Sequence, residues 1–181
     1  MGTNNEYCSD EGVLLDKNKT LLISYPNGNS RTEYAIPSSI TTIGDNAFNK
    51  SKLNNIIIPD DVSYIGNGAF SGCEGITNIV LPSHISTINT ALFANCKSLI
   101  NIVIHDDVTS IGQAAFNSCT NLASITIKNY ECQIYYADYT ICNGHTSNGS
   151  AYFNGTIYGY EGSTAQSYAE TYSRNFVAIT E

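Results

Sequence analysis

The stretch "PDDVSYIGNGAFSGCEGITNIVL", residues 59–81, is followed directly by "PSHISTINTALFANCKSLINIVI", residues 82–104, and the two share one pattern. Both begin with Pro, carry a Phe in the middle and end in an apolar run at the same spacing. Self-similarity at a fixed period of about 20 to 50 residues is the signature of a repeat architecture. The repeat therefore decides the fold, and we expect the rest of the chain to be built around it.

Two further copies, residues 37–58 and 105–127, flank this pair, so the chain contains four. The period is 23 residues, and the first copy is one residue shorter near Ser51. Six apolar columns recur in all four copies, among them Phe48, Phe70, Phe93 and Phe116. A seventh column holds Cys73, Cys96 and Cys119. No single copy can bury these columns, whereas stacked copies bury them against one another.

Each copy predicts one strand of a parallel sheet, because its final segment alternates apolar residues at a period of two. In "LINIVI", residues 99–104, Ile102 and Ile104 point to one side, and Asn101 and Val103 point to the other. The other half of the copy, typified by "VSYIGNGAFSGC", predicts a short extended segment and then an irregular or single-turn helical arc. We expect that arc to carry the buried Phe.

The unit "LxxIxLPxxVxxIGxxAFxxC" resembles the BspA-like leucine-rich repeats, a group similar to the Treponema-type repeats. The resemblance implies a repeat solenoid, a right-handed coil of 23-residue units with a parallel sheet on one face. It also implies a bacterial or protist surface protein that acts in adhesion or host interaction. His105 in place of Pro, Asn89 in place of Gly and the deletion near Ser51 depart from the unit but leave this architecture intact.

The ends of the array need caps, because a stacked array exposes an apolar face at each terminus. We expect an N-terminal hairpin cap over residues 1–36, four repeats over 37–127, and a degenerate coil with a C-terminal cap over 128–181, all in one domain. In the first cap, "GVLLDKNKTLLISYP" predicts two short strands around "DKNK". The residues expected to cover the first coil are Leu14, Leu21 and Ile23.

The C-terminal cap is expected to contain a short helix that covers the last coil. Ser163 or Thr164 is its predicted N-cap. The apolar residues that follow at helical spacing are Ala165, Tyr168, Ala169 and Tyr172. Before this helix, "CQIYYADYTI" is the candidate for the degenerate coil, and "NGHTSNGS" predicts a flexible loop tip.

Composition argues against two classes of partner. The chain has 8 Lys and Arg against 16 Asp and Glu, for a net charge of −8, and its basic residues form no cluster along the sequence. We therefore expect no nucleic-acid partner. No apolar run approaches the length of a bilayer span, so we expect no membrane insertion. The start, "MGTNNEYCSDEG", fits either a cytosolic protein or one whose signal has been removed. The family resemblance favours the second, with an extracellular or cell-surface location.

Six cysteines raise the question of disulfides. Cys73, Cys96 and Cys119 would stack at roughly the 4.8 Å spacing of strands, but parallel side chains in a ladder do not converge as a disulfide requires. We expect them to be buried free thiols that act as small hydrophobes. Cys132 and Cys142 are the better candidates for a bonded pair. Zinc is disfavoured, because the cysteines form neither a short local ligand pair nor a converging set.

Catalysis is poorly supported, and we expect no catalytic residue, no metal and no cofactor. Ser83 lies beside His84, but this pair lacks a nucleophile elbow and an oriented third member. His105 and His145 lie at non-equivalent places in the repeat. The sequence therefore predicts a protein that is not an enzyme.

Acidic turns are the remaining candidate for a metal site. The pairs at residues 60–61 and 106–107 are both Asp-Asp and lie at equivalent turns two coils apart. Their separation of roughly 10 Å is too large for one shared calcium ion. Solvated turn carboxylates explain them adequately.

The outward residues of the four repeat strands are the candidate protein-binding surface, here called the strand face. They form an Asn ladder beside an aliphatic strip, which suits an extended peptide or a protein surface. The alternative is that exposed β-branched residues only reflect strand preference. Tyr residues between 130 and 172 offer a rival patch, although cap packing explains most of them. The strand face consists of Asn55, Ile57, Asn78, Val80, Asn101, Val103, Ser124 and Thr126.

The sequence thus favours a non-catalytic module that presents a rigid surface to a protein ligand, such as a host or matrix protein. The chief alternative is a structural spacer within a larger surface protein, with no ligand site of its own.

Overall fold

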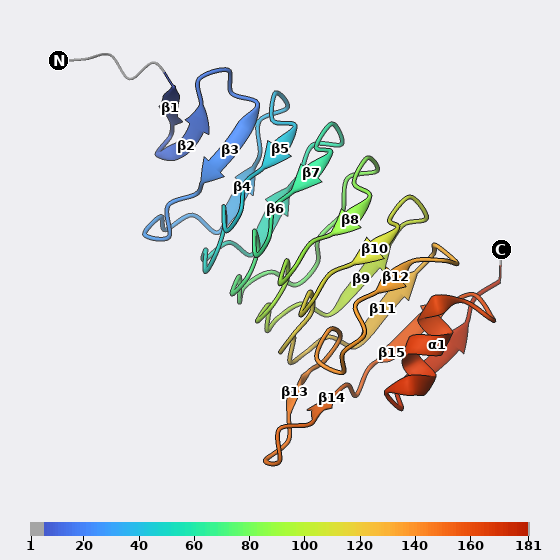
Figure 1. Cartoon of the computed structure of the whole chain (residues 1–181). Helices are drawn as coiled ribbons and strands as arrows, with labels where there is room; N and C mark the ends of the chain where they lie inside the picture. Colours follow the sequence, from blue (N-terminus) through green and yellow to red (C-terminus); the bar gives the residue numbers. More distant parts are fainter. Residues whose placement is uncertain (1–5, 181) are drawn as a thin grey trace.

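The computed structural model describes residues 6–180 and forms a β-solenoid of stacked coils (Figure 1). Residues 1–5 and 181, the two ends of the predicted single domain, lie outside the described residues. Strands one period apart in the sequence lie side by side in space and pair in parallel, as β9 (Asn101–Ile104) and β11 (Ser124–Ile127) do. The predicted repeat solenoid with a parallel sheet is confirmed.

Each coil contributes up to two short strands, and these form two rows along the solenoid (Figure 1). The first row contains the strands expected from the "NIVI"-type segments. Its members pair in two blocks, β4 (Glu33–Ala35) with β6 (Asn55–Ile57), and β9 with β11, β15 (Thr156–Gly159) and β16 (Asn175–Ala178). The second row contains the predicted extended segments: β3 (Leu21–Ser24), β5 (Thr42–Ile43) and β7 (Tyr64–Ile65), then β8 (Thr87–Ile88), β10 (Ser110–Ile111) and β12 (Gln133–Ile134).

The first row is interrupted at residues 77–81. This segment keeps the predicted alternation, with Ile79 buried and Asn78 and Val80 exposed, but it forms no strand ladder with β6 or β9. The prediction of one strand in every copy is therefore wrong at this coil. The alternation survives because it depends on which side chains enter the core, whereas a ladder also needs the backbones of adjacent coils in close register.

A continuous stack of aromatic rings occupies the centre of the core. The four Phe of the repeat are fully buried, and consecutive rings lie nearly parallel with centroids 5.3, 5.7 and 5.5 Å apart. Tyr25 extends the stack at the N-terminal end, 5.4 Å from Phe48. Such offset stacking adds to the stabilisation from burial, because each ring packs against one on either side. The Phe column is thus the main structural axis of the solenoid.

The arcs that carry these rings are joined by backbone hydrogen bonds from coil to coil. The N–H groups of Asn46, Phe48 and Lys50 donate to the carbonyls of Asn67, Ala69 and Ser71, at 2.9, 2.8 and 2.8 Å. Two residues in each arc adopt a left-handed backbone, and these form two columns: Asn46, Gly68, Ala91 and Ala114, and then Lys50, Gly72, Asn95 and Ser118. The alternating backbone turns every second N–H toward the next coil, which satisfies donors that an irregular arc would otherwise leave unpaired.

The N-terminal cap is a hairpin, as expected, but its buried face is the opposite one. β2 (Val13–Asp16) pairs antiparallel with β3, and β1 (Tyr7–Asp10) adds a further antiparallel strand. Val13, Leu15 and Leu22 are fully buried, so the prediction that residues 14, 21 and 23 cover the first coil is wrong. The physical reason is register. Leu22 pairs with Ile43 of the core column, so Leu22 points into the core, and Leu21 and Ile23 on either side of it point the other way.

Coil geometry begins upstream of the predicted boundary at residue 37. β3 and β4 both pair in parallel with strands of the first repeat, and Tyr25 occupies the ring position of a Phe. Residues 21–36 are therefore laid out as a coil. The division of the domain at residues 36 and 127 stays a prediction.

The C-terminal end follows the prediction closely. β12 pairs with β10, and Ile141 forms a parallel bridge to Phe116, so residues after 128 form the expected additional coil. The predicted loop tip, residues 143–150, contains β13 (Gly144–His145), which pairs antiparallel with β14 (Ala151–Tyr152), so only its second half is the loop between them. Helix α1 (Thr164–Thr171) begins after Ser163, whose hydroxyl accepts the Gln166 N–H as an N-cap. Its buried side chains are Ala165, Tyr168 and Ala169.

Candidate functional site

The strand face lies on the first strand row, and its side chains point outward as predicted. Ile57, Val80 and Val103 are 60%, 84% and 50% exposed, whereas the residue directly before each of them is buried. The Asn residues of the ladder, Asn55, Asn78 and Asn101, are exposed as well. Ser124 and Thr126 are only half-buried at the C-terminal end of the face. The solenoid therefore presents a polar column beside an aliphatic column.

Both columns are longer than the sequence suggested. β4 pairs Glu33 and Ala35 with the first positions of the ladder, and β15 continues it with Thr156 and Tyr158. β16 ends it with Asn175 and Val177, the latter 47% exposed. "EYAIP" before residue 37 matches "NIIIP" before residue 59, so the β4 positions could have been found from the repeat; β16 has no such signal.

A groove of about 320 Å³ opens on this face where the strand row is interrupted. It is lined by residues 55–58 of one coil and 78–80 of the next. Ile57 and Val80 are among the exposed large hydrophobic side chains, and both line the groove. The break in the backbone ladder thus coincides with the place where an apolar group from a ligand could leave water.

The cysteine column is structural. Cys73, Cys96 and Cys119 are fully buried free thiols, and each donates its S–H to the Phe carbonyl of the preceding coil, at 3.0 to 3.1 Å. Burial raises the pKa of the Cys73 thiol to about 11 and that of Cys119 to about 12. The expectation of buried free thiols is confirmed. Cys132 and Cys142 are also free and buried, so the alternative of a bonded pair is not realised.

The pair Ser83 and His84 is not arranged for catalysis. The Ser83 hydroxyl donates to the Asp60 carboxylate at 2.9 Å, and the Ser83 N–H donates to the same group at 2.7 Å. His84 Nδ1 lies 2.9 Å from the Asp60 carbonyl, so Nδ1 carries a hydrogen and cannot accept one from Ser83. The two bonds from Ser83, first the N–H and then the hydroxyl, lower the pKa of the Asp60 carboxyl. The arrangement closes a turn between two coils.

His105, Asp106 and Asp107 bring three atoms of metal-ligand type within 4.8 Å of one another. His105 Nε2 donates to the Pro82 carbonyl at 3.0 Å, which leaves the Nδ1 lone pair facing Asp107 at 4.0 Å. This donor set could take a divalent cation. Both carboxylates are exposed, however, and such turn carboxylates are common without a metal.

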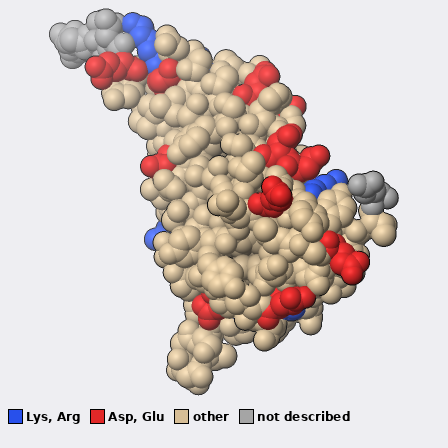
Figure 2. All heavy atoms as spheres, turned by 45° about the vertical axis from the view of Figure 1, so that its right-hand side comes forward, with Lys and Arg blue, Asp and Glu red and all other residues tan. Residues whose placement is uncertain are grey.

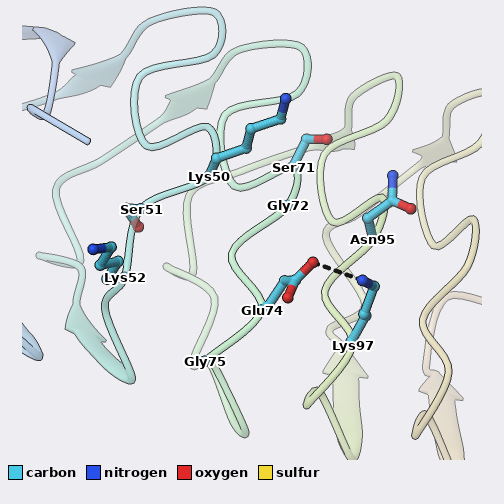
Figure 3. Close-up of a pocket in the computed structure, with 9 residues that line it drawn as sticks. All are labelled: Lys50, Ser51, Lys52, Ser71, Gly72, Glu74, Gly75, Asn95 and Lys97. Carbon is cyan, nitrogen blue, oxygen red and sulfur yellow. Dashed lines mark ion pairs between the residues drawn. The ribbon is translucent and has the colours of Figure 1, made fainter. Parts of the chain in front are cut away.

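A pocket on the loops that lead from the arcs to the strands gathers basic residues. We call it the lysine pocket; it has a volume of about 580 Å³ and is lined by Lys50, Ser51, Lys52, Ser71, Gly72, Glu74, Gly75, Asn95 and Lys97 (Figure 3). Three of the chain's 8 basic residues line it. Basic residues that are spread along the sequence thus line one pocket in the folded chain, because stacking places Lys97 near the coil that carries Lys50 and Lys52.

Charge elsewhere is sparse. Figure 2 shows small patches of Asp and Glu on a largely uncharged surface, with few Lys and Arg in view. At the C-terminal cap, Tyr168 is buried and donates to the Ala137 carbonyl at 2.8 Å, as cap packing predicts. Tyr136 is 69% exposed and lies with its ring 5.4 Å from that of Tyr172, so part of the aromatic patch faces solvent. Within residues 6–180, no helix has the length and apolar character needed to cross a membrane.

Comparison with known proteins identifies the family. The family model described as "BspA type Leucine rich repeat region (6 copies)" matches residues 24–154. This chain belongs to that family, and the match extends on both sides of the four copies at residues 37–127. A search among curated proteins finds no match to this chain.

Three solved structures resemble the fold. The pneumococcal vaccine antigen PcpA is 20% identical with a TM-score of 0.74, over 98% of this chain and 49% of that one. A leucine-rich cell surface protein from Faecalibacterium prausnitzii is 32% identical with a TM-score of 0.65, over 68% and 34%. A leucine-rich repeat protein from Eubacterium ventriosum is 30% identical with a TM-score of 0.63, over 71% and 35%. The chain thus spans half or less of these proteins.

Proposed function

We infer that this chain is a non-catalytic protein-binding module of a bacterial or protist surface protein, and that the strand face contacts its ligand in adhesion or host interaction. The observation that carries the proposal is the exposure of Ile57 and Val80 beside a groove on an otherwise regular face. Leucine-rich-repeat solenoids are typically binding scaffolds. Two of the similar structures are a vaccine antigen and a cell surface protein, which supports an extracellular or cell-surface location.

The chemistry of the strand face suits an extended peptide segment of a protein ligand. The Asn ladder offers amide donors and acceptors along the face, and these can pair with the N–H and C=O groups of an extended ligand segment. Aliphatic side chains from the ligand would enter the groove between Ile57 and Val80. The central columns carry no charge, so the affinity should depend little on salt.

The proposal is tested by a binding screen of the purified chain against immobilised extracellular-matrix and serum proteins. Val80→Lys and Val103→Lys place a charge on the strand face, and Ser63→Lys places the same charge at an exposed position directly before β7, in the second strand row. We expect a ligand that binds the unmodified chain and the Ser63 variant and that loses at least tenfold in affinity for the other two. All variants should show equal thermal stability before they are compared.

A structural spacer is the second candidate, and one observation favours it. The chain spans 49% or less of the three similar structures, so a ligand site can lie in another part of a longer protein. If neither the unmodified chain nor any variant binds in the screen, the spacer is the better description. A ligand whose affinity the two valine variants leave unchanged would place binding away from the strand face.

A further inference from the structure

We propose that the lysine pocket is a second binding site, one that takes a tetrahedral oxyanion: a sulfate or phosphate group, either free or esterified to a sugar. This proposal does not depend on the strand face, which carries no basic side chain. It rests on the charge of the pocket, on the way the backbone hollows it, and on the hydrogen-bond donors that line it.

The charge of the pocket is opposite to that of the whole chain. Three lysines, Lys50, Lys52 and Lys97, and one acid, Glu74, line the pocket in a protein of net charge −8. Lys97 forms an ion pair with Glu74 at 2.7 Å, whereas the structure shows no carboxylate partner for Lys50 or Lys52 within residues 6–180. Two lysines left without acids in an acidic protein create a local positive potential, which attracts an anion.

The hollow depends on two glycines and a deletion. A Cβ at Gly72 would lie 2.9 Å from Lys50 Cγ, and a Cβ at Gly75 would collide with the Asn54 side chain. Gly72 also has φ +71°, which a side chain would strain. The first coil is one residue shorter at this place. Its Ser51 is small and buried, and it contacts Cys73 at the edge of the pocket. The second coil therefore contributes a backbone floor between the side chains of its two neighbours.

The donors around this floor match an oxyanion. Figure 3 shows Lys50, Ser71 and Asn95 reaching from three successive coils on one side of the pocket. Lys97 is turned toward Glu74, but an ammonium group has three N–H donors and the ion pair uses one. Lys52 points away from the pocket, so it contributes positive electrostatic potential but no hydrogen bond to the anion. Ammonium, hydroxyl and amide donors together can surround the oxygens of a sulfate or phosphate group.

The test is a titration of the isotope-labelled chain, followed by two-dimensional amide NMR. The probes are sodium phosphate, sodium sulfate and a heparin-derived tetrasaccharide, each at constant ionic strength. We expect the largest shifts at residues 50–52, 71–75 and 95–97. Lys50→Gln and Lys97→Gln should each weaken binding by about five- to tenfold, because each removes one unit charge close to the anion. Glu74→Gln should tighten it, since the only acid of the pocket is lost.

Lys128→Gln is the matched control, because Lys128 is an exposed lysine outside the pocket. Shifts in the pocket with all three probes support a site for the free anion. Shifts with the tetrasaccharide alone, lost in the Lys50 and Lys97 variants, support an anion borne on a sugar. The proposal is overturned if no probe shifts the pocket amides, or if the Lys128 variant weakens binding as much as the pocket variants do. Val103→Lys should leave this titration unchanged, which separates the site from the strand face.

Discussion

Replacing Phe93 by Ala tests the aromatic stack as the structural axis. The Phe93 ring is fully buried and lies between Phe70 and Phe116, 5.7 and 5.5 Å away with interplanar angles of 6° and 15°. Phe-to-Ala changes in cores cost about 3 to 5 kcal/mol through lost transfer energy and the cavity left behind. We expect the upper half of that range, because the ring takes part in two stacked pairs worth roughly 0.5 to 1.5 kcal/mol each.

The assay is urea unfolding followed by circular dichroism, with Val103→Lys as the comparison. Val103 lies one position from a core residue of the same strand and is half exposed, so Lys should change the free energy of unfolding by less than about 0.5 kcal/mol. A loss below about 1.5 kcal/mol for Phe93→Ala would contradict the reasoning. Equal losses for the two variants would mean that the strand register is shifted by one residue.

Three further predictions concern the backbone, a carboxylate and the thiols. Ala91 has φ 54°, so Ala91→Gly should raise the free energy of unfolding by about 0.5 to 1 kcal/mol. Ala115 is buried and has no positive φ, so Ala115→Gly should lower that free energy. Urea unfolding measures both changes. The Asp16 carboxylate accepts the Leu21 and Thr20 N–H groups at 2.7 Å each, and these bonds, chiefly that from Leu21, lower its pKa. A carboxyl with a lowered pKa stabilises the folded state at pH values above its ordinary pKa of 3.8, and this stabilisation is lost as the pH falls through the lowered pKa. The difference between the urea midpoints of the unmodified chain and Asp16→Asn should therefore disappear in that low-pH range. With a thiol reagent at neutral pH, the half-buried Cys8 should react in the folded protein, and the five buried cysteines should react only on unfolding; rapid labelling of Cys96 in the native state would contradict the burial that raises its pKa.

The repeat made the core predictable, whereas its edges were harder to predict. Every Phe and Cys of the array occupies the place that the 23-residue period assigns, because one spatial environment recurs in each coil. The two strands of the N-terminal hairpin, "VLLD" and "LLIS", carry apolar residues at adjacent positions. Their sequences therefore do not show which face of each strand is buried. Only the pairing of Leu22 with Ile43 selects the buried face, and that contact lies outside the strand itself.

The lysine pocket illustrates a second limit. Lys52, Glu74 and Lys97 each follow the Ser or Cys of the seventh column by one residue, so the period aligns them, but it does not show that the space between their coils is hollow. Their proximity follows from the stacking and from the glycines of the coil between them. The left-handed positions are equally hidden, because Asn, Gly and Ala occupy one column, and the backbone conformation there is set by the hydrogen bonds between arcs.

The coil-to-coil hydrogen bonds between arcs have a mechanical consequence. Each coil is bonded to the one before and the one after, so tension applied between the two ends passes through the coils in series. We expect such a chain to peel from an end one coil at a time instead of rupturing at once. Each coil of 23 residues would then release roughly 80 Å of extended chain. We expect a segment of this kind to lengthen under tension and to dissipate the mechanical work in repeated small steps.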